Sequence, residues 1–301
     1  MFTKVSFHQT LLTLGLICLI PCGCATTQKI TDDIMGTGPT LDKKIAILPS
    51  EDAGGGQNDV HELVPAVVAN FLERNCEGLL IVETPALDDA LSGVVTSEGN
   101  IDKLALAEVG RIHGLSAVVH PRIDDLRLYR EKRGIWGFRE VHTLLEMALH
   151  IRMFDIETTA VLLDDLTVEE TVVPHPPAED EADPLNLDDG FLRSVLFQVT
   201  DRATEQICVS LRETPWKGYI TQSDGDTFHV SAGQDVGLRP GDRLEVFAMA
   251  DPIEGVNEQI YLVPGQKIGE IEVEEVFERH STAVKRAGEN LEKSACLMLK
   301  R

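Results

Sequence analysis

The sequence predicts an α+β protein in which a mixed sheet with packed helices is followed by a small all-β, barrel-like domain. Residues 43–213 alternate short apolar runs with stretches of helical periodicity, a pattern typical of helices packed on a sheet. After residue 214 the pattern changes to short strands with turn signals about every 8–12 residues. A chain of 301 residues that is 43 % hydrophobic can bury a core in each domain and is not disordered throughout.

The first domain is predicted to run strand, helix, strand, two helices, three strands and a final helix. Pro49 ends the first apolar run, Pro85 occupies the favoured first position of a helix, and Gly114 lies where a helix C-cap is expected. The polar segment 155–159 is predicted to be a hairpin turn between two alternating runs. The predicted elements are strand 44–49, helix 60–76, strand 79–82, helix 86–91, helix 102–113, a strand from 116 that extends as far as 129, strands 142–154 and 161–173, and helix 191–211.

The second domain is predicted to cover residues 214–301. The segments 224–226 and 237–242 carry the Asp-Gly and Pro-Gly sequences of tight turns. Apolar and acidic residues alternate over 268–276, which predicts a half-exposed strand. The predicted strands are 218–220, 228–230, 244–247, 268–276, 281–285 and 295–299.

The N-terminal residues 1–23 have the pattern of a secretory signal. One charged residue, Lys4, precedes an apolar run over 11–20, which is shorter than the roughly 20 residues that a membrane-spanning helix needs. The sequence from Pro21 to Ala25 then reads Pro-Cys-Gly-Cys-Ala.

This segment resembles a bacterial lipoprotein signal, which implies that Cys24 becomes the lipidated first residue. Cys22 is the alternative acceptor, and an ordinary cleaved signal is the alternative to lipidation. By the same resemblance, Ala25 after the cysteine implies transfer to the outer membrane, with the protein facing the periplasm. Residues 24–42 are polar and rich in Gly, Thr and Asp, and are predicted to be a flexible tether.

Three further cysteines remain in the mature chain: Cys76, Cys208 and Cys296. The periplasm permits disulfides, so a Cys76–Cys208 bridge between two helix ends is one prediction. Buried free thiols are the other.

The net charge of −23 comes from 50 Asp and Glu against 27 Lys and Arg. General binding to nucleic acid is therefore excluded, because it depends on clustered basic residues. The acidity lies mainly in residues 24–213, where 35 acidic residues oppose 16 basic ones, a net charge of −19.

No catalytic constellation is found, so the chain is not predicted to be an enzyme, and no metal or cofactor is predicted. The glycines 54–56 follow a strand but lack the Lys and Ser/Thr of a phosphate loop and are flanked by acids. His142 and His150 share a face of a predicted strand about 26 Å apart, too far to bind one metal. The carboxylates at 179–183 lack the spacing of a calcium loop.

One segment runs against the acidity of the first domain. Its basic residues surround an apolar, glycine-flanked centre, Ile135-Trp136-Gly137-Phe138. Basic flanks with an aromatic tip suit contact with anionic headgroups or with the groove of a partner protein. The alternative is a hairpin whose Trp136 folds back onto the sheet. The basic residues are Arg127, Arg130, Lys132, Arg133 and Arg139.

The second domain looks like the C-terminal domain of flagellar assembly protein T. The resemblance departs at 255–263, where relatives carry a plainer hairpin. The segments that carry it are 218–220, 228–233, 237–242, 244–246, 268–273 and 281–283.

The first domain is similar to curli-assembly lipoproteins, to the middle domain of flagellar assembly protein T and to lipoprotein activators of penicillin-binding proteins. The curli channel crosses its membrane with strands from this domain, whereas the connections here look too short for strands of about 9–11 residues. The matching segments are 45–49, 80–83, 107–119 and 151–158.

These observations predict an outer-membrane lipoprotein that acts as a scaffold or accessory factor in envelope or flagellar assembly through contacts with other envelope proteins. A regulator of peptidoglycan synthesis is the alternative, and an oligomeric secretion channel is disfavoured by the short connections. The sequence specifies neither the partner nor the oligomeric state.

Overall fold

The structure is a computed structural model that describes residues 40–50, 60–95, 100–135, 137–176, 184, 187–249, 251–254, 260–263, 265–291 and 295–300. Leu41–Lys300 form one compact unit. The predicted signal with Cys22 and Cys24 lies outside the described residues, as do the glycines 54–56 and the carboxylates 179–183.

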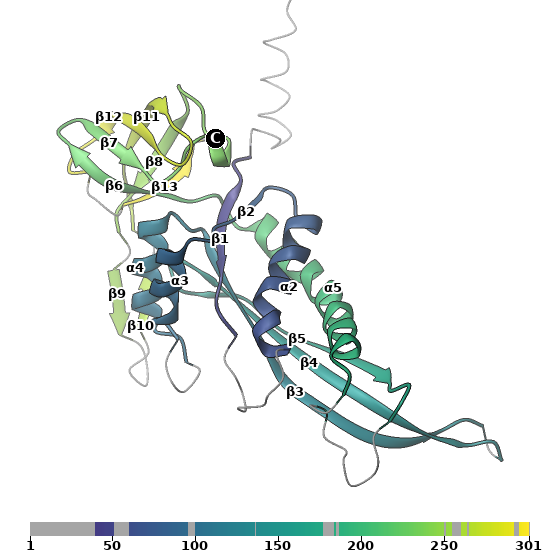
Figure 1. Ribbon diagram of the computed structural model, residues 1–301. Coiled ribbons are helices and arrows are strands. Elements are labelled where there is room, and N and C mark those ends of the chain that lie inside the picture. The colour runs from purple at the N-terminus through teal and green to yellow at the C-terminus, as the bar shows by residue number, and fades with distance from the viewer. Residues whose placement is uncertain are drawn as a thin grey trace, which may run out of the picture. The chain divides into compact units, whose positions relative to one another are not determined.

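A five-stranded mixed sheet forms the first part of this unit (Figure 1). Its strand order is β2-β1-β3-β4-β5, so β2 and β5 are the edges. β1 is parallel to both of its neighbours, while the β3–β4 and β4–β5 pairs are antiparallel. The strands are β1 (Lys43–Ile47), β2 (Leu79–Ile81), β3 (Ala117–Arg133), β4 (Glu140–Asp155) and β5 (Val161–Val172).

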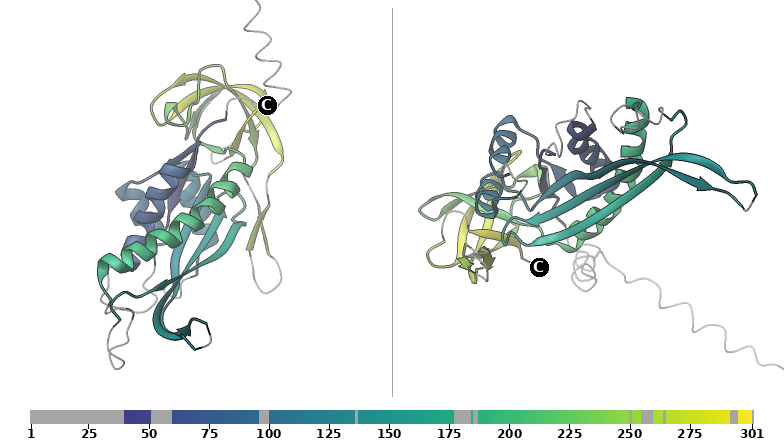
Figure 2. Two further views of the ribbon diagram at one scale, coloured as in Figure 1. Left: turned by 90° about the vertical axis from the view of Figure 1, so that its right-hand side faces the viewer. Right: turned by 90° about the horizontal axis from the view of Figure 1, so that it is seen from below.

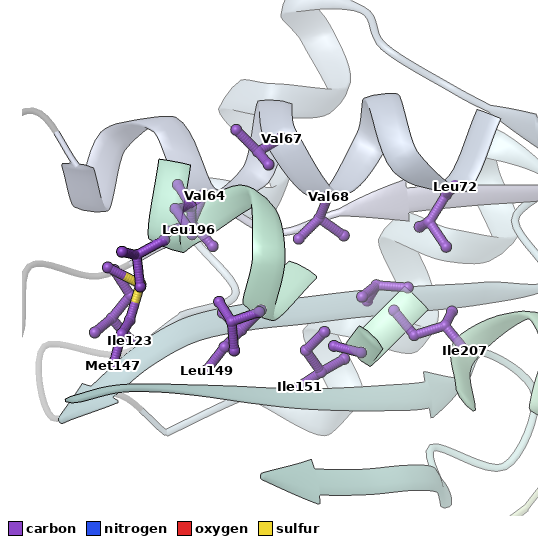
Figure 3. Close-up of a cluster of buried hydrophobic side chains, with 14 of the residues drawn as sticks. Val64, Val67, Val68, Leu72, Ile123, Met147, Leu149, Ile151, Leu196 and Ile207 are labelled. Carbon is purple, nitrogen blue, oxygen red and sulfur yellow. The ribbon is translucent and has the colours of Figure 1, made fainter. Parts of the chain in front are cut away.

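Helices cover both faces of the sheet. Neighbouring strand residues point to opposite faces, so Val119 joins the cluster beneath α2 (Val60–Asn75) and α5 (Asp189–Glu213), while Val118 joins the cluster beneath α3 (Pro85–Ser92) and α4 (Lys103–His113). Figure 3 shows how apolar residues of α2 and α5 meet those of β3 and β4 in the first cluster.

The helix ends follow from local sequence. The Asp102 carboxylate accepts hydrogen bonds from the Leu104 and Ala105 amides at 3.0 and 3.1 Å and so caps the N-terminus of α4. Gly114 ends the same helix with a φ of 71°, a conformation that favours glycine. Thr84 caps α3, and Pro85 occupies its first turn, where no amide hydrogen is needed.

The second part of the unit is a closed six-stranded barrel in the order β11-β12-β7-β6-β13-β8. A separate two-stranded hairpin, β9 (Asp251–Glu254) with β10 (Ile260–Val263), and the short 3-10 helix η3 (Gln234–Val236) lie in its connections. The barrel strands are β6 (Gly218–Asp224), β7 (Thr227–Val230), β8 (Arg243–Phe247), β11 (Lys267–Val276), β12 (Ser281–Gly288) and β13 (Cys296–Leu299).

The predicted fold class is confirmed: the structure contains a mixed sheet with packed helices and a small closed barrel. Several strands are longer than predicted: β3 continues to Arg133 and not only to Tyr129, β6 ends at Asp224, and β12 ends at Gly288. β3 and β4 have 17 and 16 residues, so the prediction that the connections in this domain are too short for strands of about 9–11 residues is wrong for this hairpin. Leu41 is buried in the barrel cluster, and the Asp42 amide donates to the Val236 carbonyl at 3.0 Å.

Candidate functional site

The candidate contact region is the far end of the β3–β4 hairpin. The two strands pair from Ala117 opposite Asp155 to Arg133 opposite Glu140, with one register shift between Ile123 and Asp125. The hairpin extends beyond the helices that cover the sheet (Figure 2). We call residues 132–135 and 137–139 the tip.

A tight turn forms the tip. The Phe138 amide donates to the Ile135 carbonyl at 2.9 Å, and Gly137, the third residue of this turn, has a φ of 95°. Gly134 has a φ of 127°, and a Cβ atom there would lie 2.2 Å from the Phe138 carbonyl oxygen. The chain can therefore close this turn only because both positions lack a side chain.

The turn holds two apolar side chains in solvent. Ile135 is 77 % exposed and Phe138 is 80 % exposed, the highest values among the large apolar residues in the described part of the chain. Trp136 between them lies outside the described residues. Neither Ile135 nor Phe138 packs back onto the sheet, which leaves both free to contact another molecule.

Most of the basic residues along the hairpin are neutralised by neighbouring acids. Arg127 pairs with Glu146 at 2.6 Å, and Arg133 pairs with Glu131 at 2.7 Å and with Glu170. Hydrogen bonds from Tyr129 and Arg133 hold the pKa of Glu170 below its usual range.

Two bases at the tip differ from the others. Within the residues that the structure describes, Lys132 and Arg139 form no ion pair, whereas Arg130 does have an interaction partner. The described part of the tip therefore carries two basic side chains that no ion pair neutralises.

A second polar cluster joins the sheet to the barrel. The ammonium group of Lys217 pairs with Asp155, and that of Lys44 pairs with Asp235 at 2.9 Å and donates to the Ser231 carbonyl at 2.9 Å. Both lysine residues are only 6 % exposed. One lysine reaches from the sheet to the barrel and the other from the barrel to the sheet, so the cluster acts as a structural junction.

Two reactive residue types lie next to this junction, and neither is poised for catalysis. Burial raises the pKa of the Cys296 thiol to about 12, so almost no nucleophilic thiolate exists near neutral pH. Tyr219 is fully buried, and burial raises its pKa well above the ordinary value.

A third group of charges lies on the face of the sheet opposite α2 and α5. His150 contacts Asp164 at 2.6 Å and Asp124 at 3.2 Å. His120 is 1 % exposed and lies 3.4 Å from Arg152. Burial, with the positive charges of Arg152 and Arg122, lowers the pKa of His120 to about 4.

The described residues contain neither a candidate metal cluster nor a candidate membrane-spanning helix. No three His, Cys, Asp or Glu side chains there come together in a way that could hold a metal ion. None of the helices among these residues combines the length and apolar character needed to cross a bilayer.

No protein-family model and no curated protein matches the chain. A hypothetical protein from Chlamydia trachomatis aligns with 56 % of this chain and 99 % of its own, at 10 % identity and a TM-score of 0.35. A lipoprotein from Neisseria meningitidis aligns with 56 % of this chain and 99 % of its own, at 13 % identity and a TM-score of 0.32. TolB from Acinetobacter baumannii aligns with 81 % of this chain and 58 % of its own, at 12 % identity and a TM-score of 0.30. Likenesses of this size assign neither a family nor a function.

The structure brings together those predicted contact residues that it describes, Arg130, Arg133, Ile135 and Phe138, at one end of the hairpin. Cys76 and Cys208 form a disulfide with a Cα–Cα distance of 5.3 Å, and Cys296 is a buried free thiol. The resemblances to flagellar assembly protein T and to curli-assembly lipoproteins stay predictions.

The junction lysines were not among the predicted site residues. A signal was present, because Lys44 and Lys217 each stand beside apolar residues in segments that become buried. Their partners could not be found in the same way, because Asp155 and Asp235 are far away in sequence.

Proposed function

We propose that this protein is a non-enzymatic lipoprotein of the outer membrane that faces the periplasm. In this proposal it serves as a scaffold or accessory factor in envelope or flagellar assembly and acts through protein–protein contacts at the tip. The proposed lipid anchor and the proposed location at the outer membrane rest on the sequence around Cys24. The proposed assembly role rests on the resemblances of the two domains.

The observation that carries the proposal is the exposure of Ile135 and Phe138 on a turn that two glycines make possible. A tight turn that already holds its apolar side chains in solvent loses less conformational entropy on binding than a disordered loop does. Phe and Arg, both present in the tip, are also among the residue types enriched at protein interfaces.

The contact role is tested with the full lipidated protein. Ile135→Ser with Phe138→Ser should abolish tip-dependent recovery of envelope proteins in a pull-down from a detergent extract. A matched control is Leu104→Ser with Ile112→Ser on α4, which removes two other exposed apolar side chains (44 % and 62 % exposed). Equal recovery from the tip variant and the wild type would refute the contact role.

The anchor is tested separately by palmitate labelling in cells. We expect labelling to be lost in Cys24→Ala and kept in Cys22→Ala. The reverse pattern would place the lipid on Cys22, and labelling in both variants and in their combination would refute the anchor.

A further inference from the structure

We infer that the tip binds an apolar groove with an acidic rim on a partner protein, on the side of the molecule away from the anchoring bilayer, and that it does not bind the bilayer itself. This inference rests on the proposed lipid anchor and on the proposed contact role of the tip. It decides between the two kinds of surface, lipid headgroups and a protein groove, that a basic tip with apolar side chains could meet.

The direction of the strands places the tip and the start of β1, where the anchor chain leaves, at opposite ends of the sheet. β1 runs parallel to β3, and Ile45 lies opposite Ala117, the first residue of β3. Lys43 is therefore at the end of the sheet where β3 begins, and the tip is at the other end. At about 3.3 Å per residue, the 17 residues of β3 and the start of β1 separate Lys43 from the tip by about 60 Å.

The barrel fixes the start of the described chain at that same end. Leu41 is 5 % exposed within the barrel cluster, and the Asp42 amide is bonded to the Val236 carbonyl. The chain from Cys24 to Thr40 can span at most about 60 Å even when fully extended. An upright molecule therefore holds its tip far from the bilayer, and the tip reaches that bilayer only if the molecule tilts toward the surface on an extended tether or lies flat along it.

Charge opposes that flat orientation. Residues 24–213 carry a net charge of −19, and a molecule lying flat would bring this acidic domain against a bilayer that contains anionic phospholipid. Among the described residues of the tip, Lys132 and Arg139 are the bases without an ion pair, because Glu131 and Glu170 pair with Arg133; Arg127, further along the hairpin, pairs with Glu146. Two charges at one end do not offset repulsion along the whole domain.

The same two bases define the chemistry of the partner. Ile135 and Phe138 need an apolar pocket that removes them from water, and Lys132 and Arg139 flank them. Carboxylates around such a pocket would complement both bases and would accelerate association at low salt. The complementary surface is therefore an apolar groove with Asp or Glu at its rim.

Orientation is tested by fluorescence energy transfer from a labelled cysteine to acceptor lipids. The lipidated protein is placed in vesicles of phosphatidylethanolamine and phosphatidylglycerol, with a donor at Ile135→Cys or at Gln234→Cys. Gln234 lies in η3 next to Val236, beside the point where the anchor chain leaves. Labelling is specific, because Cys76 and Cys208 are bridged and Cys296 is buried.

We expect clearly greater transfer from position 234 than from position 135. Equal transfer from the two positions, or greater transfer from 135, would overturn the inference, because it would place the tip at the bilayer.

The chemistry is tested by charge reversal, with the tip-dependent partner from the pull-down purified. Lys132→Glu with Arg139→Glu should weaken its binding by about tenfold or more at low salt, and added salt should weaken the wild type toward the variant. The control, Arg74→Glu with Arg193→Glu, reverses two exposed bases on α2 and α5 and should bind like the wild type.

The failures of the two proposals are distinguishable. A partner that depends on Ile135 and Phe138 but ignores both charge reversal and salt would overturn the acidic groove and leave the contact role intact. Absence of any tip-dependent partner would refute the contact role itself, and the inference with it.

Discussion

Lys44 and Lys217 connect the sheet and the barrel through side chains that are almost completely removed from water. A buried ammonium group is stable only when its charge and hydrogen bonds are satisfied, and each lysine has a carboxylate partner in the other part of the molecule. Asp155 has a second role, because its other carboxylate oxygen accepts from the Thr158 amide at 2.8 Å and shapes the β4–β5 turn.

Removing one partner of the Lys217–Asp155 pair should therefore be strongly destabilising. We expect Lys217→Met to lower the free energy of unfolding by about 3–5 kcal/mol, because it leaves Asp155 buried without its counter-charge. Adding Asp155→Asn should recover a large part of this loss. Chemical denaturation measures both values.

A lysine in a surface ion pair provides the control. Lys300 pairs with Glu270 at 2.6 Å in a solvent-exposed position, so Lys300→Met should change stability by no more than about 1 kcal/mol. Similar losses for Lys217→Met and Lys300→Met would contradict the role given to burial.

His120 makes stability depend on pH. Its pKa is about 4 in the folded protein and about 6.5 in an unfolded chain, so between these values the unfolded state binds more protons. Stability contributed by neutral His120 is complete above pH 6.5 and is lost as the pH falls toward 4. The expected slope from this residue is at most about 1.4 kcal/mol per pH unit.

His120→Gln should remove that contribution while keeping a polar group near Arg152. The free energy of unfolding, measured between pH 6.5 and 4, should fall less steeply in this variant than in the wild type. Identical slopes for His120→Gln and the wild type would show that His120 is not the source.

At the scale of single elements, α4 shows how far local sequence determines structure. Asp102 caps its first turn and Gly114 closes its last, and both residues can be identified without the structure. Asp102→Ala should lower the free energy of unfolding by about 1 kcal/mol, since the amides of Leu104 and Ala105 lose their acceptor. Asp89→Ala, an exposed acid in α3, is a control expected to stay within about 0.5 kcal/mol.

The order of elements up to α5 could be predicted because each apolar run has the period of a strand or a helix and ends at a turn or cap residue. The far half of β3 was harder to predict from the sequence, because its residues beyond Ile123 are mostly charged and its pairing register with β4 shifts there. β9 and β10 were missed as strands: they are four residues each, and β9 contains Pro252, which usually argues against a strand.

The tip was predictable in kind, because basic residues flank an apolar segment with two glycines. Its charge balance was not, since Glu146 and Glu170 neutralise Arg127 and Arg133 from β4 and β5, which join β3 in one sheet only after folding. The junction between sheet and barrel was still harder to predict from the sequence, because Lys44 and Asp235 are 191 residues apart in the chain (235 − 44). Long-range pairing of this kind has no local signature.

At the scale of the whole molecule, one covalent bond links two helices that are distant in sequence. Cys76 follows α2 and Cys208 lies in α5, 132 residues later. Closing a loop of this length reduces the entropy of the unfolded chain by an amount equivalent to about 5 kcal/mol, and measured effects are usually smaller.

The double variant Cys76→Ser with Cys208→Ser should therefore lose about 2–5 kcal/mol of stability. Dithiothreitol should shift the denaturation midpoint of the wild type toward that of the variant and leave the variant unchanged. An unaltered midpoint in the double variant would contradict a stabilising role for this bond.

The register shift in β3 sets the phase of the entire hairpin. Before it, the odd-numbered residues Val119 and Ile123 face the core beneath α2 and α5, and after it the even-numbered Leu126 and Leu128 do. If the alternation ran on unbroken through Asp124, with no extra residue in β3, Leu126 and Leu128 would face water and Arg127 would enter the core. A single inserted residue thus determines, about ten positions away, which side of the molecule the tip presents to a partner.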